Sequence, residues 1–448
     1  MASAAEQLAA TFNFSALAKA HELKQRIWFT LGALIVYRIG THIPLPGIDP
    51  VALNILFEQQ SGGVLGMFNM FSGGALGRMA IFALNIMPYI TAAIIMQLVS
   101  SMSPKLDALK KEGEAGRKKI NQYTRLFTVI LAAAQAFGIA AGLEGMSAGG
   151  GGVVLDPGMF FRISTVITLT GGTIFLMWLG EQITARGVGN GISLIIFSGI
   201  VANLPTAGAQ MLELGRTGAL STVVIIVILL VGVVTIATIV FFERAQRRLV
   251  IQYPKRQVGN RMFGGESSHL PLKLNSSGVI PPIFASSLLL LPLTVVNFGT
   301  TPVGGGWFQS VIAQLQHGQP LFIVLYVALI VFFAFFYTGV VFNPADTAEN
   351  LRKHGGFIPG IRPGKNTAEY INYVLTRITA VGAAYLAAIS VSPEILLARY
   401  ALPFFFGGTS LLIVVNVTMD TVAQVHSHLL AHQYEGLIKK ARLKGRRG

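Results

Sequence analysis

The sequence contains no cysteine and few charged side chains for its length. Because none of the 448 residues is a cysteine, disulfides, zinc–thiolate sites and thiol catalysis are excluded for this chain. Charged residues make up 12%, whereas soluble globular proteins have about a quarter. With 52% hydrophobic residues and a mean hydropathy of +0.62, this composition indicates a membrane protein with several spans rather than a soluble enzyme.

Familiar catalytic and nucleotide-binding motifs are also missing. The sequence has no GxxxxGK[ST] phosphate loop and no HExxH zinc motif. The glycine-rich run at 187–191 follows no strand and precedes no phosphate-binding lysine, so we interpret it as a packing or hinge feature. Of the histidines His426, His428 and His432, the first two are two residues apart and cannot share a helical face. We therefore predict no enzyme activity, no metal site and no cofactor.

The apolar segments are long enough to predict ten membrane-spanning helices. They cover about 25–43, 79–99, 122–142, 160–180, 188–204, 219–242, 279–298, 320–342, 370–390 and 403–424.

The distribution of basic residues predicts the orientation of these helices. With a cytoplasmic N-terminus, 29 of the 34 lysines and arginines fall on the cytoplasmic side. This is the positive-inside asymmetry, and it predicts that both termini are cytoplasmic. Residues 1–23 are mildly polar and precede an ordinary span, so we expect no cleavable signal.

The stretch 61–100 predicts an interrupted path through the membrane. Paired glycines at 62–63 and 73–74 enclose about ten apolar residues, too few to cross a bilayer that needs roughly 20. The uncharged segment 79–99, which contains Pro88, is long enough to cross. A short half-helix at membrane depth must be enclosed by protein or must face a water-filled cavity. Because ionisable residues are nearly absent from the helix centres, with Asp420 near a helix end as the clearest exception, we predict a conduit without ion coupling.

Two long basic loops and several polar helix residues extend this prediction. The loops 244–274 and 343–370 are candidate docking surfaces for an acidic or RNA-bearing partner. The alternation in LVIQY predicts a hairpin in the first loop, and glycine–proline turns in the second display Arg362. Five polar residues inside apolar helices either form ordinary hydrogen bonds between helices or mark a weakly held seam: Thr91, Gln97, Gln135, Ser286 and Ser287.

Several runs of sequence resemble the bacterial SecY family, the channel subunit of the Sec protein translocon. They are MFNMFSGGAL (67–76), NIMPYITAAIIMQL (85–98), GEQITARGVGNGIS (180–193), HLPLKLNSSGVIPPIFASS (269–287), FNPADTAENL (342–351), GFIPGIRPG (356–364) and FGGTSLLIVV (406–415). The resemblance extends over the whole chain.

This resemblance implies an all-α polytopic membrane fold made of two inverted five-helix halves. The halves would cover 1–206 and 207–425, followed by a basic cytoplasmic tail at 426–448. They would enclose a pore that opens across the membrane and sideways into lipid. The implied plug, within about 64–73, consists of Val64, Leu65, Met67, Phe68, Asn69, Met70 and Phe71. The implied pore ring consists of Ile86, Ile90, Ile192, Ile196, Ile283 and Ile413. The spacings 86/90 and 192/196 each suit one helix face.

The resemblance also implies a gate, docking residues and partners. Thr91, Gln135, Ser286 and Ser287 would line a lateral gate that binds signal sequences. The implied docking residues for the SecA motor ATPase and the ribosome are Lys255, Arg256, Arg261 and Arg362. The family's first loop often has a basic pair, of which Asn260 replaces the first member here. Small SecE-like and SecG-like subunits, nascent polypeptides and the lipid of the bacterial cytoplasmic membrane complete the implied partners.

Two other functions remain open at this point. A secondary transporter for a small solute would also have inverted halves and a broken helix. The absence of ionisable residues at mid-membrane depth and the two large loops argue against it. A membrane enzyme lacks a candidate nucleophile, metal site or acid–base pair.

Overall fold

The computed structural model describes most of the chain, and the statements below concern only the residues that it describes. These are residues 20–53, 69, 71–145, 147–148, 151–218, 221–253, 256–258, 261–263, 267–297, 314, 319–400 and 408–444.

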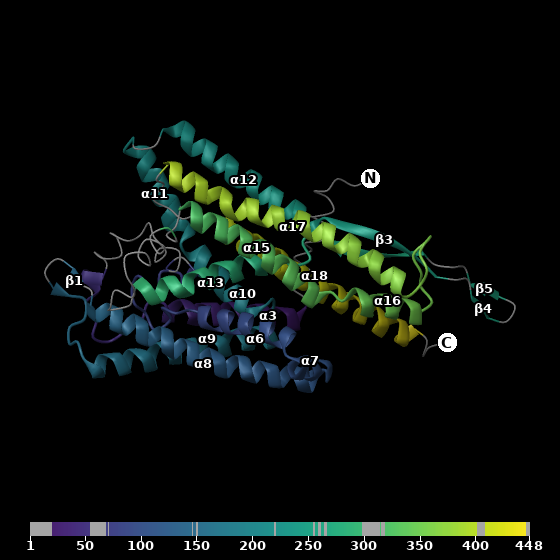
Figure 1. Ribbon diagram of the computed structural model, residues 1–448, viewed down its shortest axis with the longest axis horizontal. Helices are drawn as coiled ribbons and strands as arrows, with labels where there is room; N and C mark the ends of the chain where they lie inside the picture. Colours follow the sequence, from purple (N-terminus) through teal and green to yellow (C-terminus); the bar gives the residue numbers. More distant parts are fainter. Residues whose placement is uncertain are drawn as a thin grey trace.

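Long helices make up the body of the molecule, and most run along its longest axis (Figure 1). In chain order the helices are α3 (His21–Gly40), α6 (Met87–Met102), α7 (Pro104–Lys111), α8 (Glu114–Gly145), α9 (Met159–Arg186), α10 (Gly191–Ala202), α11 (Leu204–Arg216), α12 (Thr222–Arg244), α13 (Ile280–Asn297), α15 (Pro320–Val341), α16 (Pro344–Lys353), α17 (Lys365–Tyr400) and α18 (Gly408–Lys444).

Short antiparallel strand pairs lie at the two ends of this body (Figure 1). One pair joins β1 (Ser147–Ala148) to β2 (Gly151–Gly152). At the other end, β3 (Gln246–Gln252) pairs with β6 (Ser267–Lys273), and β4 (Arg256–Val258) pairs with β5 (Arg261–Phe263) beyond them. The predicted hairpin in the first basic loop is therefore confirmed. We call the end that carries β3–β6 and α16 the hairpin end.

Seven helical segments among the described residues are long and apolar enough to cross a membrane. They are 114–145, 159–186, 191–216, 222–244, 320–353, 365–393 and 408–431. Helix α6 and residues 280–289 of α13 are apolar but shorter. The prediction of a helical protein with several spans is confirmed at this level.

The predicted helix 79–99 is wrong at its start. Residues 72–86 form turns, and α6 begins only at Met87. Met79 and Asn85 have positive φ angles of 42° and 49°, which an α-helix does not accommodate. Pro88 lies in the first turn of α6, where its missing N–H leaves no helical hydrogen bond unmade. The interruption in the membrane path is thus longer than the glycine pairs alone indicated.

Glycine at position 191 allows α9 and α10 to pack closely at the glycine-rich run. A Cβ at Gly191 would lie 1.9 Å from the carbonyl oxygen of Gly180, closer than any side chain permits. Asn190 caps α10 by accepting hydrogen bonds from the backbone of Ile192 and Ser193. The packing role predicted for this run is therefore confirmed.

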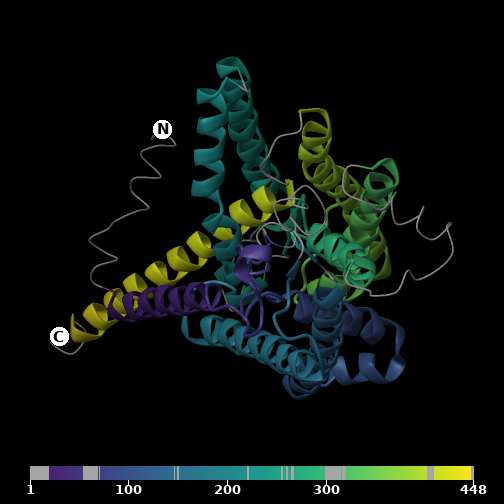
Figure 2. The same cartoon turned by 90° about the vertical axis from the view of Figure 1, so that its left-hand side faces the viewer.

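Helix α12 is exposed along most of its length. Figure 2 shows α11 and α12 rising from the body of the molecule. Ile239 is the one described side chain of α12 that is buried, although the helix is almost wholly apolar. A helix with this composition requires lipid or another apolar helix around it.

Candidate functional site

The six isoleucines of the predicted ring all belong to one apolar cluster. Ile86, Ile90, Ile196 and Ile413 are buried in it, and Ile192 and Ile283 pack against it. They come from the start of α6 and from α10, α13 and α18. Helix α6 contacts α13, and α10 contacts α18. The structure therefore brings side chains from both halves of the sequence together, as the prediction requires, within a cluster that extends well beyond them.

Ile86 differs from the prediction in its local structure. It is the N-cap of α6 and does not lie within the helix, so the expectation that 86 and 90 share one helix face is corrected. The carbonyl of Ile86 nevertheless accepts a hydrogen bond from the backbone N–H of Ile90 at 3.1 Å. The two side chains are therefore still one turn apart, and both are buried.

Polar side chains at the contact between α6 and α13 bond mostly within their own helices. Thr91 donates to the carbonyl of Met87 at 3.1 Å. Ser286 and Ser287 both donate to the carbonyl of Ile283, at 2.9 and 2.8 Å. Between the two helices, Ser287 Oγ approaches Met87 Sδ at 3.8 Å. Because sulfur is a weak acceptor, this contact holds the helices together only weakly.

Gln135 of α8 adds a buried amide near the same helices. Its Oε1 atom is buried without a hydrogen-bond partner, and α8 contacts both α6 and α13. An unpaired amide oxygen in an apolar setting costs free energy until a donor reaches it. The four predicted gate residues thus lie on α6, α8 and α13, which contact one another.

Only the end of the predicted plug lies within the described residues. Val64, Leu65, Met67, Phe68 and Met70 lie outside them, whereas Asn69 and Phe71 are described. Asn69 Oδ1 accepts from the backbone of Gly77 at 2.7 Å. Asn85 Nδ2 donates to the carbonyl of Phe71 at 2.7 Å. Gly199 of α10 allows this carbonyl to come close, since a Cβ there would lie 2.6 Å from it.

Two arginines hold the glycine pair that follows the plug. Arg38 Nη1 and Arg78 Nη2 both donate to the carbonyl of Gly73, at 2.8 and 3.2 Å. Within the described part of the chain, no carboxylate forms a salt bridge with either guanidinium. Partial burial and then the charge of Arg38 lower the pKa of Arg78, which lies outside the helices. Residues 72–86 are thus an irregular, buried segment with its own set of hydrogen bonds.

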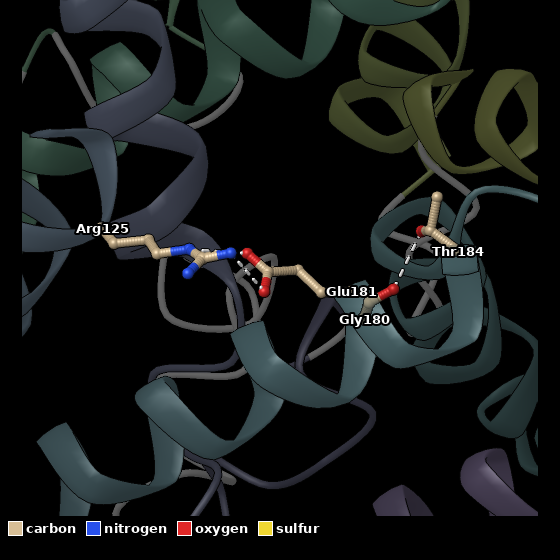
Figure 3. Close-up of polar contacts among 4 residues, drawn as sticks. All are labelled: Arg125, Gly180, Glu181 and Thr184. Atoms are coloured by element: carbon tan, nitrogen blue, oxygen red, sulfur yellow. Dashed lines mark hydrogen bonds and ion pairs between the residues drawn. The ribbon is translucent and has the colours of Figure 1, made fainter. Parts of the chain in front are cut away.

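Helix α8 is tied to α9 by a bidentate ion pair. Arg125 donates to both carboxylate oxygens of Glu181, through Nε at 2.9 Å and Nη2 at 2.7 Å (Figure 3). Thr184, on the next turn of α9, donates to the carbonyl of Gly180 at 2.9 Å and accepts from the backbone of Gly191. Bidentate arginine–carboxylate pairs fix geometry better than single contacts. This arrangement joins α8, α9 and α10 into one unit.

The two basic loops are joined at the hairpin end. Gln252 of β3 and Phe357 exchange two backbone hydrogen bonds, of 2.9 and 3.0 Å. A second apolar cluster lies beneath them, formed by Leu249, Leu272, Ile358, Ile371, Val374 and Ile378. We call β3, β6 and residues 354–364 the docking unit, because backbone hydrogen bonds and this apolar cluster connect them.

One predicted docking residue, Arg362, belongs to this unit, and two others lie on the neighbouring strands β4 and β5. Arg362 is exposed, and its carbonyl accepts from Thr367 Oγ1 at 2.9 Å. Arg256 and Arg261 lie on the paired strands β4 and β5, where only the backbone is described. Lys255 and Asn260 lie outside the described residues.

The sequence interpretation missed the residues that hold the irregular segment. In the sequence, Arg38 and Arg78 are two of the five basic residues that fall outside the cytoplasmic set. Glu181 could have been noticed as the acidic residue directly after the span 160–180.

A structural comparison identifies the class of fold. A solved structure of a translocation channel, described with the plug domain of the SecY protein, matches with a TM-score of 0.64. The match covers 91% of this chain and 92% of that chain, at 18% identity. A channel in a canine ribosome–channel complex matches with a TM-score of 0.61 over the same shares, at 17% identity. The chain therefore has the fold of a membrane-embedded protein-conducting channel.

Sequence comparisons then identify the family. The SecY family model matches residues 80–422. The protein translocase subunit SecY of Rickettsia typhi is 56% identical over 424 residues, which cover 95% of this chain and 98% of that protein. The chain belongs to the SecY family, as its sequence motifs predicted.

Membership of this family decides between the functions left open by the sequence. A channel subunit of the translocase is not an enzyme by itself, and the secondary transporter is not favoured. The run GMSAG at 145–149 has the GxSxG spacing of a nucleophile elbow. Gly145, however, ends helix α8, whereas such an elbow follows a strand.

Proposed function

We propose that this chain is the passive protein-conducting channel of a bacterial translocase, with its constriction at the six isoleucines. The observation that carries this proposal is the meeting of isoleucines from α6, α10, α13 and α18 in one apolar cluster. A ring of branched aliphatic side chains deforms around an extended polypeptide. It also resists wetting, so ions leak little and no selectivity filter is needed.

The proposed channel has ten spans in two inverted halves, 1–206 and 207–425. Helices α3, α6 and α13 would be the three spans added to the seven long apolar segments. Helices α6 and α13 would be shorter because the path of the chain is broken near the ring. The hairpin end would then be cytoplasmic, together with both termini and the basic tail 426–448. This orientation is supported by the concentration of lysine and arginine in the loops of that end.

The proposed lateral gate lies between α6 and α8 on one side and α13 and α15 on the other. Its support is the weakness of the contact between α6 and α13, where the hydroxyl groups bond within their own helices. An apolar signal sequence would replace the lost contacts when the helices part, and it would thereby stabilise the open form. Gln135, with its unpaired oxygen, would gain a partner in that form.

The proposed plug is the apolar segment that ends at Phe71. Asn85, Arg38 and Arg78 fix the chain just after it, so movement would stop at the glycine pair 73–74. The segment before this point can then leave the constriction without disturbing the start of α6.

The proposed partners follow from exposed surfaces and from related proteins. The docking unit, together with the adjoining segment 255–261, would bind the SecA motor and the ribosome through Arg362, Lys255, Arg256 and Arg261. The similarity to the channel in the canine ribosome–channel complex supports the proposal that the ribosome is a partner. The exposed apolar side chains of α12 would face lipid or a SecE-like or SecG-like subunit.

We expect replacement of residues 64–68 by a Gly–Ser linker of equal length to raise resting ion conductance. This change leaves Asn69 and its hydrogen bond to Gly77 in place, so the hinge is kept while the seal is lost. The measurement is the conductance of planar bilayers containing the purified channel complex, together with export of a secretory precursor.

Export should continue at a reduced level, because the ring and the gate are intact. As a control, the same linker length replacing residues 206–210 of α11 should leave conductance unchanged. Conductance equal to that of the parent channel would rule out the plug assignment.

A further inference from the structure

A carboxylate lies among apolar helices near the hairpin end, and the proposed channel has so far given it no role. Glu243, in the last turn of α12, accepts a hydrogen bond from Asn275 Nδ2 at 2.6 Å. The side chain of Asn416 on α18 also bonds to it, and the charges of Lys273 and Asp420 act on it. Ionisable residues within membrane helices are expensive to bury, so they generally have a function.

Asn275 connects this carboxylate to the segment that leads into α13. Its amide also donates to the carbonyl of Gly278 at 3.0 Å, and its Oδ1 accepts from Ser277 at 3.0 Å. Asn275, Ser277 and Asn416 are 3%, 4% and 6% exposed. The amides and the hydroxyl that surround the half-buried carboxylate are thus shielded from water, where a lost partner costs most.

The backbone beside Asn275 is fixed as well. The N–H of Leu274 donates to the carbonyl of Ala245 at 2.9 Å, which continues the pairing of β3 with β6. A Cβ at Gly382 of α17 would lie 2.8 Å from the carbonyl of Leu274, so α17 packs directly on this point. Residues 274–279, which we call the link, are therefore held directly by α12 and α17, and α18 contributes through Glu243.

The link lies between the docking unit and the proposed gate. It begins directly after β6 and ends directly before α13. Ile283 and Ser287 follow within the first two turns of α13. A displacement of the docking unit would therefore be transmitted to the ring and the gate through the six residues of the link. Glu243 anchors these residues through Asn275.

We propose that Glu243 is a positioning residue that holds the link, and with it the start of α13, in the closed arrangement until the docking unit is displaced. This inference rests on the proposed function, since it assigns a regulatory role within the same channel. The surroundings suit an anchor better than a proton relay, because the hydrogen-bond partners of the carboxylate are the amides of Asn275 and Asn416, which do not titrate.

The test compares the opening of the seam with and without a docking partner. Because the chain has no native cysteine, two spin labels can be attached to cysteines introduced at exposed Ile130 of α8 and exposed Leu288 of α13. Pulsed electron paramagnetic resonance then measures the distance between the labels in proteoliposomes. Glu243→Ala, Glu243→Gln and Asn275→Ser are compared with Glu213→Ala, a control at an exposed glutamate of α11.

Parting of α8 and α13 would lengthen the distance between the two labels. In the parent channel, we expect this longer distance to become populated only when the SecA motor binds. In Glu243→Ala, we expect its population without SecA to rise about tenfold, as for loss of one hydrogen bond to a charged group. Glu243→Gln keeps an acceptor oxygen and should give a smaller rise. A purely structural role would lower the amount of folded protein without making the distance independent of SecA.

Equal distance distributions in Glu243→Ala and Glu213→Ala, with equal responses to SecA, would overturn the inference. If Glu243→Ala does not accumulate in membranes, Glu243→Gln and Asn275→Ser decide by the same comparison. Failure of the proposed function is distinguishable, because the labelled parent channel would then not translocate a secretory polypeptide at all.

Discussion

Replacing Ile413 with asparagine is expected to make the resting channel conduct ions and export chains that lack a signal sequence. Ile413 is 1% exposed in the apolar cluster, so the new amide would be buried without partners in the closed form. An unsatisfied buried amide costs about 1–3 kcal/mol, which shifts the balance toward open, wetted forms by roughly tenfold or more. Ile283→Asn, on α13 of the same half, should add to this effect.

The measurement combines bilayer conductance with export of a precursor whose signal sequence has been removed. A matched control is Ile167→Asn on α9, because Ile167 is 67% exposed and belongs to neither the ring nor the gate. The control should leave both readouts near the parent values. Export that stays strictly dependent on a signal sequence in the double variant Ile283→Asn, Ile413→Asn would count against the ring.

Replacing Arg362 with glutamate is expected to reduce motor-driven translocation at least about tenfold. Arg362 is exposed on the docking unit, so the substitution reverses a charge on a surface that is proposed to bind a partner. The fold should be unaffected, since Arg362 contributes its carbonyl, not its side chain, to the contact with Thr367. The measurement is ATP-dependent uptake of a precursor by proteoliposomes supplied with SecA.

Lys365→Glu provides a control with the same change of charge three residues away. Lys365 lies at the start of α17, 3.9 Å from Glu369, and has no role in the docking unit. We expect a much smaller loss for this variant. Equal losses for both variants would show that net charge matters rather than Arg362 itself, and normal uptake by Arg362→Glu would refute its docking role.

The sequence predicted the features that depend on periodicity and composition. The long apolar segments appear as α8, α9, α12, α15 and α18, because an apolar run of sufficient length forms its hydrogen bonds within one helix. The hairpin at LVIQY followed from alternating side chains, which a strand places on opposite faces. The six ring isoleucines came from the family resemblance, since nothing in an isoleucine alone separates a pore position from a packed one.

The sequence did not predict the features that depend on distant contacts. Within the turn-rich segment 72–86, the apolar run 79–84 suits a helix. The segment is held in another conformation by Arg38, by Asn85 and by the close approach of Gly199. The pairing of Arg125 with Glu181 and the burial of Glu243 join residues on different helices. Such contacts follow from tertiary packing, which local patterns do not contain.

The central claim, that a polypeptide passes through the isoleucine ring, is tested most directly by disulfide crosslinking. Because the chain has no native cysteine, single cysteines can be placed at Ile86, Ile283 or Ile413, with Ile167 and Ile226 as exposed controls. A secretory polypeptide with one cysteine is then stalled during translocation and exposed to a mild oxidant. We expect crosslinks at the three ring positions and none at the controls. If the engaged polypeptide reacted with no ring position, or equally with the controls, the proposed path through the channel would be wrong.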